Sequence, residues 1–131
     1  MITWFFDPGL KTGYAKYRNA TLVDWGEFDL WRGLESRISR GDEVVYESFF
    51  LGNPAFRPTG IEVIGVIKYI CEKFDINPKT QSPSKIIGVF RWPIYDFSRI
   101  KSQHAKDAIA HGIICFGGSV RLPEYFYTRE D

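Results

Sequence analysis

Three strand-forming runs in close succession at the start of the chain constrain its fold more than any other feature. Residues 2–6, 13–18 and 21–28 are rich in β-branched and aromatic side chains, as strands are. A tight turn at Asn19 and Ala20 joins the second run to the third. Short connections join antiparallel neighbours, so the sequence predicts that the first three strands are antiparallel.

The rest of the chain alternates between helical and strand-like patterns. Apolar spacing predicts helices at residues 31–39 and 60–74, one from Ser82 or Ser84 to about 90, and one at 102–116 that ends at Gly117 and Gly118. Strands are expected at 43–49 and 79–81, with a Gly- and Pro-rich loop at 51–59 and an irregular aromatic stretch at 91–100. Strands in series, followed by strands alternating with helices, indicate an α/β fold with a mixed sheet flanked by helices.

The length of 131 residues is that of a single domain, expected to span residues 1–131, and 44% hydrophobic residues is typical of a folded protein. The net charge of +1 does not indicate a nucleic-acid-binding protein, but residues 57–106 carry nine basic against four acidic side chains. This half is either a basic binding face or an ordinary solvated surface. Cys71 and Cys115 lie in apolar segments, so buried thiols are expected. The sequence shows no membrane span or leader, which predicts a cytoplasmic protein of a bacterial or phage-infected cell.

Acidic residues occupy unusual positions in this pattern. Asp7 ends the first strand, Glu47 lies near the end of the fourth, and Asp107 lies inside the last helix, at the margin of its apolar stripe. His104 and His111 share the helix face of Asp107. An unpaired charge beside a core is costly, and a divalent cation such as Mg²⁺ or Mn²⁺ would supply the missing partner.

Each of these residues also has an ordinary structural explanation. An Asp before Pro-Gly is commonly a turn former, which alone is the better explanation of Asp7. Glu47 could face solvent by strand alternation, and His104 could be an exposed polar residue. The acids and histidines taken together make the functional interpretation the stronger one.

Four segments together resemble the RuvC family of Holliday junction resolvases, within the RNase H-like superfamily. "FFDPGLKTGYA" is similar to the opening strand and turn of the family, and "YESFFLGNPA" to the segment with its second carboxylate. "HAKDAIAHGI" is similar to the last helix, where two ligands lie three residues apart, and "SPSKIIG" to a helix entry. The chain is shorter than typical bacterial members, which favours a short, phage-type or organellar version.

The resemblance implies a five-stranded mixed sheet with helices on both faces and a catalytic, metal-binding site of Asp7, Glu47, His104 and Asp107 around two Mg²⁺ or Mn²⁺ ions. His104 would be either a ligand or the group that orients water. It further implies DNA contacts, which are expected at Phe50, Lys85, Arg91, Lys101 and Lys106. Phe50 stands at the position of an aromatic wedge at the crossover. Residues 91–97 have no counterpart in the family and could serve the core, base stacking or a dimer contact.

The interpretation that follows is a metal-dependent endodeoxyribonuclease that resolves Holliday junctions or other branched DNA in recombination and repair. Paired nicks require two sites, so a homodimer is expected, with the 60–74 helix as a plausible interface. Two alternatives are a related nuclease acting on flaps or RNA–DNA hybrids, and a non-catalytic nucleic-acid-binding module. A nucleotide-binding protein is disfavoured, because "GLKTG" lacks the Walker A spacing and the chain is too short for a two-domain kinase-like fold.

Overall fold

A central five-stranded sheet organises the protein, whose computed structural model describes residues 1–48 and 58–128. The strands are β1 (Ile2–Asp7), β2 (Lys11–Arg18), β3 (Thr21–Asp29), β4 (Glu43–Glu47) and β5 (Lys79–Gln81). Their order in the sheet is β3-β2-β1-β4-β5. The first three strands are antiparallel, whereas β4 is parallel to both β1 and β5. The predicted mixed sheet is therefore confirmed.

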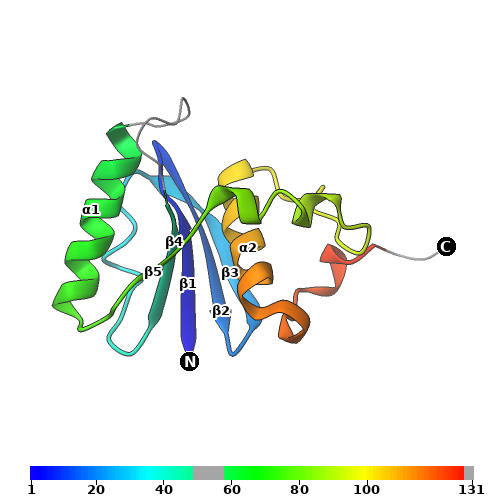
Figure 1. Ribbon diagram of the computed structural model, residues 1–131, viewed down its shortest axis with the longest axis horizontal. Coiled ribbons are helices and arrows are strands. Elements are labelled where there is room, and N and C mark those ends of the chain that lie inside the picture. Colours follow the sequence, from blue (N-terminus) through cyan, green and yellow to red (C-terminus); the bar gives the residue numbers. More distant parts are fainter. Residues whose placement is uncertain (49–57, 129–131) are drawn as a thin grey trace.

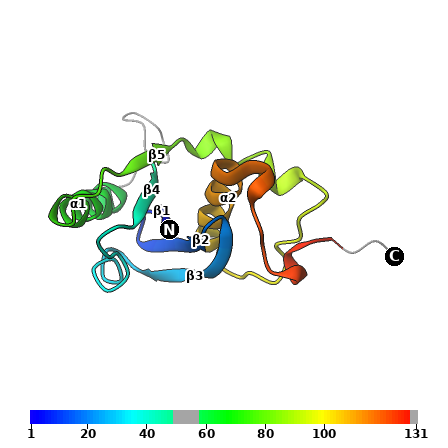
Figure 2. The same cartoon turned by 90° about the horizontal axis from the view of Figure 1, so that it is seen from below.

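Two long helices cover opposite faces of this sheet. They are α1 (Pro58–Lys73) and α2 (Gln103–Phe116), and Figures 1 and 2 show them as separate layers on either side of the strands. Four short 3₁₀ turns complete the described elements: η1 (Pro83–Lys85), η2 (Val89–Arg91), η3 (Gly117–Ser119) and η4 (Glu124–Phe126). None of the helices in the described ranges is both long and apolar enough to cross a bilayer.

The alternation of side chains along the strands divides the apolar residues into two cores. Trp4 and Phe6 of β1 belong to the core on the α1 side, while Phe5 between them belongs to the core on the α2 side. In β4, Val45 likewise belongs to the α2 core. Since side chains two positions apart share a face, Asp7 has the orientation of Phe5, and Glu47 has that of Val45. Both acids thus point to the α2 side.

Two of the predicted helices are absent. Residues 31–37 form successive turns, although Leu34 and Ile38 are buried as their spacing indicated. Gly33 lies inside this segment, and the Arg37 guanidinium donates to its carbonyl at 2.9 Å, a local bond that does not depend on helical structure. The predicted helix at 82–90 is replaced by η1 and η2, which are separated by residues that include Gly88, a poor residue for a helix interior.

Smaller differences concern element ends and the thiols. β2 begins at Lys11, two residues earlier than predicted, and α1 begins at Pro58. β4 ends at Glu47, and Phe49 and most of the predicted 51–59 loop lie outside the described residues. Cys71 is buried as expected, but Cys115 is exposed, since it lies on the solvent side of α2.

The aromatic segment at 91–97 is partly core and partly surface. Tyr95 and Phe97 pack against the core on the α2 side, and the Phe97 ring lies 6.2 Å from that of Phe126. Trp92 and Ile94 are exposed at 43% and 55%. The structure therefore accounts for half of this segment by packing and leaves its other side chains at the surface.

Candidate functional site

The first two acids of the site come from adjacent parallel strands. Phe6 pairs with Tyr46 in the β1–β4 register, so Asp7 and Glu47 follow at the same level, at the carboxyl ends of their strands. They are only 4% and 7% exposed. Since β1 is the central strand of the sheet, the position of Asp7 is fixed by strands on both sides.

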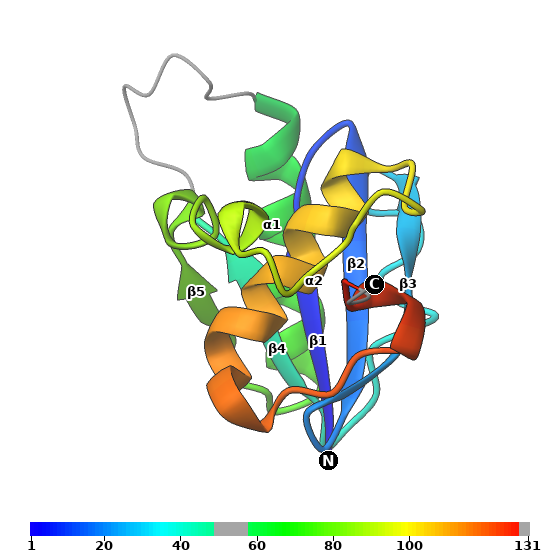
Figure 3. The ribbon, with the colours of Figure 1, turned by 90° about the vertical axis from the view of Figure 1, so that its right-hand side faces the viewer.

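Helix α2 lies unusually close to the sheet, and two glycines make this possible. A Cβ added to Gly13 of β2 would lie 2.0 Å from the carbonyl oxygen of His104, and one added to Gly112 would lie 2.2 Å from the Tyr17 ring. Both distances are far below van der Waals contact, so only glycine fits at either position. Figure 3 shows α2 crossing in front of β1 and β2 as a result of this contact.

Hydrogen bonds at two points fix α2 along its axis. The Ser102 hydroxyl caps the helix by accepting from the backbone N–H of Ala105 at 3.1 Å, and it donates to Glu27 of β3 at 2.6 Å. Two turns later, the buried Tyr17 hydroxyl donates to the carbonyl of Ile109 at 2.8 Å. The first turns of α2, which carry His104 and Asp107, are therefore held above the ends of the strands.

The structure brings the residues from these segments together. Nδ1 of His104 lies 2.9 Å from Oδ2 of Asp7, and the imidazole is about half exposed. Asp107 is partly buried, and its Oδ1 accepts a hydrogen bond from the Gln103 amide at 2.8 Å. One polar cluster thus forms from residues that are far apart in the sequence: Asp7, Glu47, His104 and Asp107.

The carboxyl groups are close enough to shift one another's pKa. Burial raises the pKa of Asp7 to about 8 against an opposing hydrogen bond from His104, and the charges of Glu47 and Asp107 raise it further. Burial also raises the pKa of Asp107, with a contribution from the charge of Glu47. The hydrogen bond to Asp7 raises the pKa of His104. Burial and the neighbouring carboxyl charges therefore favour the protonated form of Asp7, whereas the hydrogen bond from His104 favours its ionised form.

Glu47 shows the opposite behaviour. Its burial alone would raise its pKa, but hydrogen bonds from His111 and Asp7 outweigh burial and lower the pKa below its ordinary value. The pKa values of Glu47 and Asp7 thus shift in opposite directions, and Glu47 is the one whose ionised form is favoured. Two carboxyl groups side by side with opposite shifts are characteristic of sites that perform acid–base or metal chemistry.

Two members of this cluster were not among the predicted site residues. His111 lies two turns after His104 on the same face of α2, with its Nε2 3.0 Å from Oε1 of Glu47. Its Nδ1 lies 2.8 Å from Oε1 of Gln81, the residue opposite Glu47 in the β4–β5 pair. The helical spacing of His111 was visible in the sequence, whereas nothing in the sequence indicated Gln81.

The described DNA-contacting residues predicted from the sequence do not bond to the members of the cluster. Lys85, Arg91 and Lys101 are exposed, and Lys106 is half buried. Among residues 1–48 and 58–128, none of these four side chains forms an ion pair. Phe50 lies outside the described residues.

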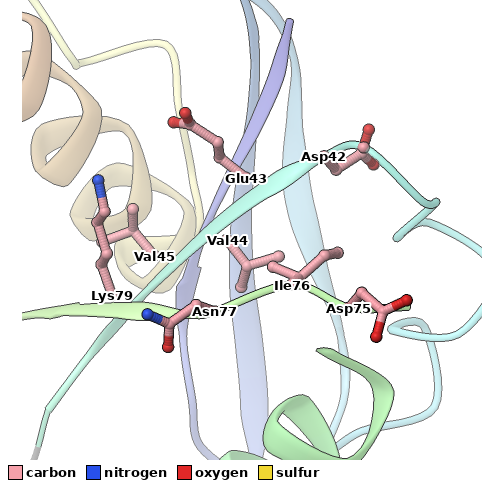
Figure 4. A pocket seen from close by; sticks show the side chains of 9 residues that line it. Asp42, Glu43, Val44, Val45, Asp75, Ile76, Asn77 and Lys79 are labelled. Atoms are coloured by element: carbon pink, nitrogen blue, oxygen red, sulfur yellow. The ribbon is translucent and has the colours of Figure 1, made fainter. Parts of the chain in front are cut away.

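A hollow at the opposite end of the sheet is not part of this cluster. It is lined by the start of β4 and the segment that leads into β5, including Asp42, Glu43 and Asp75. Figure 4 shows the three acidic side chains pointing away from one another, with Val44 and Ile76 between them. No predicted site residue lines it, and its acids do not converge on a common point.

Comparison with known proteins connects the fold, but not the sequence, to known nucleases. No family model matches the chain, and no curated protein matches it. The chain is similar to Thermus thermophilus RuvC in complex with a Holliday junction substrate, with a TM-score of 0.62 and 12% identity over 87% of this chain and 91% of that one. A second Thermus thermophilus RuvC structure gives a TM-score of 0.56, also at 12% identity. The fold is therefore RNase H-like, as expected.

Proposed function

We propose that this chain is a metal-dependent endonuclease that cuts branched DNA, with the four-way junction as its substrate. The observation that carries the proposal is the grouping of Asp7, Glu47 and Asp107, three acids that affect one another's pKa on one face of the sheet. The RNase H-like fold adds support, because a similarly folded RuvC has been solved with a Holliday junction.

The chemistry of these side chains fits a hard divalent cation. Their oxygens are the donors that Mg²⁺ and Mn²⁺ prefer, and the raised pKa of Asp7 is that of a buried carboxyl group without sufficient positive charge nearby. In the described part of the chain, no three His, Cys, Asp or Glu side chains are already grouped around a common point. Instead, His104 and His111 each bond one oxygen of an acid.

The proposed ligands of two metal ions are Asp7, Glu47 and Asp107, with His104 as a fourth ligand or as the group that orients water. Such ions activate a water molecule and stabilise the leaving oxygen during phosphodiester hydrolysis. Asp7 must lose its proton before it can act as a ligand. His104 bonds to Asp7 and is partly exposed, so it is suited to pass that proton to solvent.

The proposed DNA contacts are the basic residues and the aromatic residue expected from the sequence. Lys85, Arg91, Lys101 and Lys106 would bind phosphates, and Phe50 would act as the wedge at the crossover. The exposed Trp92 offers an additional ring for stacking on an unpaired base. These side chains would hold the DNA backbone close to the acids, which would otherwise repel it.

Two-fold symmetry of a four-way junction calls for two copies of the site, so we propose a homodimer. The outer surface of α1 supports this assignment. Tyr69 and Ile61 are exposed at 68% and 45%, and Trp31 lies beside the helix at 39%. Exposed apolar side chains gathered on one surface are typical of an interface.

Cleavage of a matched set of substrates tests the proposal. A synthetic four-way junction, a flap, an RNA–DNA hybrid and a linear duplex would be incubated with the protein and Mg²⁺. We expect paired nicks in the junction and little cutting of the duplex. Equal cutting of all four substrates contradicts the junction assignment, and preferential cutting of the hybrid or flap supports the related nuclease instead.

Two variants test the site in the same assay. Asp7→Asn should abolish cutting while junction binding persists, because removal of a carboxylate relieves repulsion of phosphate. Asp75→Asn is the matched control, since Asp75 lies at the opposite end of the sheet, where it forms an ion pair with Arg40. Cutting by the Asp7 variant at the rate of the control contradicts the role of Asp7.

A further inference from the structure

His111 is a buried histidine whose side chain has no role in the function proposed above. It is 1% exposed, and both of its ring nitrogens have partners. It lies four residues after Asp107 and seven after His104, so it is on the same face of α2 as both. The helix that carries two proposed metal-site residues thus also contacts a third, Glu47, through His111.

The chemistry of the partners fixes how His111 is bound. An ionised carboxylate can only accept hydrogen bonds, so Nε2 must carry the hydrogen that lies between His111 and Oε1 of Glu47. The Gln81 carboxamide has both donors and an acceptor and can satisfy Nδ1. Gln81 is partly buried and pairs with Glu47 across the β4–β5 ladder, so His111 contacts the side chains of two residues that lie side by side in the sheet.

We propose that His111 is a positioning residue for Glu47, an inference that rests on the proposed metal-dependent function. The bond to Oε1 would restrain rotation of the carboxylate, and it leaves Oε2 free of this hydrogen bond for a metal ion. Gln81 in turn holds the imidazole in place. Carboxylates that bind metals are commonly held by such outer partners, and loss of a partner typically weakens metal affinity by about 10–100-fold.

A purely structural role for His111 predicts a different result. In that case the hydrogen bonds only satisfy buried polar groups, and replacement of His111 would lower the thermal stability without a specific effect on metal binding. Metal affinity measured on folded variants therefore separates the two explanations.

The experiment compares His111→Leu with His111→Gln. Leucine removes the donor to Glu47, whereas the glutamine amide places an N–H close to the position of Nε2. Mn²⁺ affinity would be measured by isothermal titration calorimetry on the full chain, with circular dichroism and the melting temperature to establish folding. We expect about 10–100-fold weaker Mn²⁺ binding for the leucine variant and most of the affinity restored in the glutamine variant.

Gln81→Ala is the second variant, because a buried leucine can prevent folding. It leaves His111 intact and removes only the side chain that orients it, so Mn²⁺ binding is expected to weaken by less than in the leucine variant. The inference is overturned if the folded leucine variant binds Mn²⁺ like the wild type. If that variant does not fold, unchanged affinity of Gln81→Ala overturns it.

The wild-type titration distinguishes this inference from the function on which it rests. A wild-type chain that neither binds Mn²⁺ nor cuts DNA contradicts both. A wild type that binds and cuts, together with variants of unchanged affinity, contradicts only the role of His111.

Discussion

His104 and Asp7 are 97 positions apart in the sequence, yet Nδ1 of the first lies 2.9 Å from Oδ2 of the second. This contact joins the last helix to the first strand at the point where Glu47 also ends its strand. The proposed function depends on this arrangement. Each prediction below tests either the arrangement itself or the charges that it brings together.

Metal binding should stabilise the wild-type protein through these acids. A ligand that binds only the folded state at 100 times its dissociation constant adds about 2.7 kcal/mol, which corresponds to roughly 10 °C in melting temperature for a chain of this size. We expect such a shift with Mn²⁺ and its loss in Asp7→Asn. Differential scanning fluorimetry at pH 8 measures it, and equal shifts in both proteins would contradict the assignment.

The metal-free protein should lose stability as the pH rises through the folded-state pKa of Asp7. Burial raises that pKa from 3.8 to about 8, so the folded state binds the Asp7 proton more tightly than the unfolded state does. The resulting stability is fully present below pH 3.8 and is lost progressively up to about pH 8. Asp7→Asn removes this dependence, because asparagine does not ionise.

The expected result is a gap between the two proteins that widens with pH in the presence of EDTA. Near pH 4 their melting temperatures should agree within a few degrees, and at pH 8.5 the variant should melt higher by about 3–8 °C. Asp75→Asn, at a well-exposed acid, should follow the wild type throughout. A gap that stays constant from pH 4 to 8.5 would show that Asp7 ionises normally.

Gly13→Ala should prevent close packing of α2 on the sheet. The added methyl group would lie 2.0 Å from the His104 carbonyl oxygen, so the helix must move and the Asp7–His104 contact must break. We expect destabilisation of about 3 kcal/mol or more, or no folded protein. Urea unfolding measures this change.

Gly65→Ala is the matched control for this substitution. Gly65 lies in α1, and an added Cβ meets no atom within 4 Å. Alanine favours helix by about 1 kcal/mol relative to glycine, so this variant should be slightly more stable than the wild type. A Gly13 variant as stable as the Gly65 variant would contradict the close packing of α2 on β2.

Lys106→Gln should weaken junction binding in a salt-dependent way. A lysine that contacts one phosphate contributes about 0.9 to the slope of log affinity against log salt concentration, so the slope should become shallower by about that amount. Fluorescence anisotropy between 50 and 200 mM salt would measure it. Lys79→Gln, at the hollow on the opposite end of the sheet, should leave the slope unchanged.

Much of the fold could be predicted from local patterns. The short turns between three strand-like runs correctly predicted the antiparallel half of the sheet. The spacing of apolar residues predicted the ends of α1 and α2 to within two residues. The prediction of a helix at residues 31–39 was wrong, because the same spacing of apolar residues also occurs in turns that bury Leu34 and Ile38. Spacing identifies which side chains are buried more reliably than the backbone conformation between them.

The candidate site was predictable only in part. Asp7 and Glu47 stood out because acids at the ends of apolar strands are unusual, and His104 and Asp107 because of their helical spacing. The partner of His111 could not be predicted, since it depends on the register of β4 against the three-residue strand β5, which places Gln81 beside Glu47. Such a short strand carries no pattern from which a register could be inferred.

A crystal structure of the protein with Mn²⁺ tests the central claim most directly. Anomalous diffraction at the manganese edge would locate bound ions without reference to activity. We predict anomalous density between the carboxylates of Asp7, Glu47 and Asp107, and its loss in crystals of Asp7→Asn grown in the same way. A well-ordered wild-type site without manganese at saturating concentration, or with manganese only elsewhere, would contradict the proposed metal-dependent nuclease.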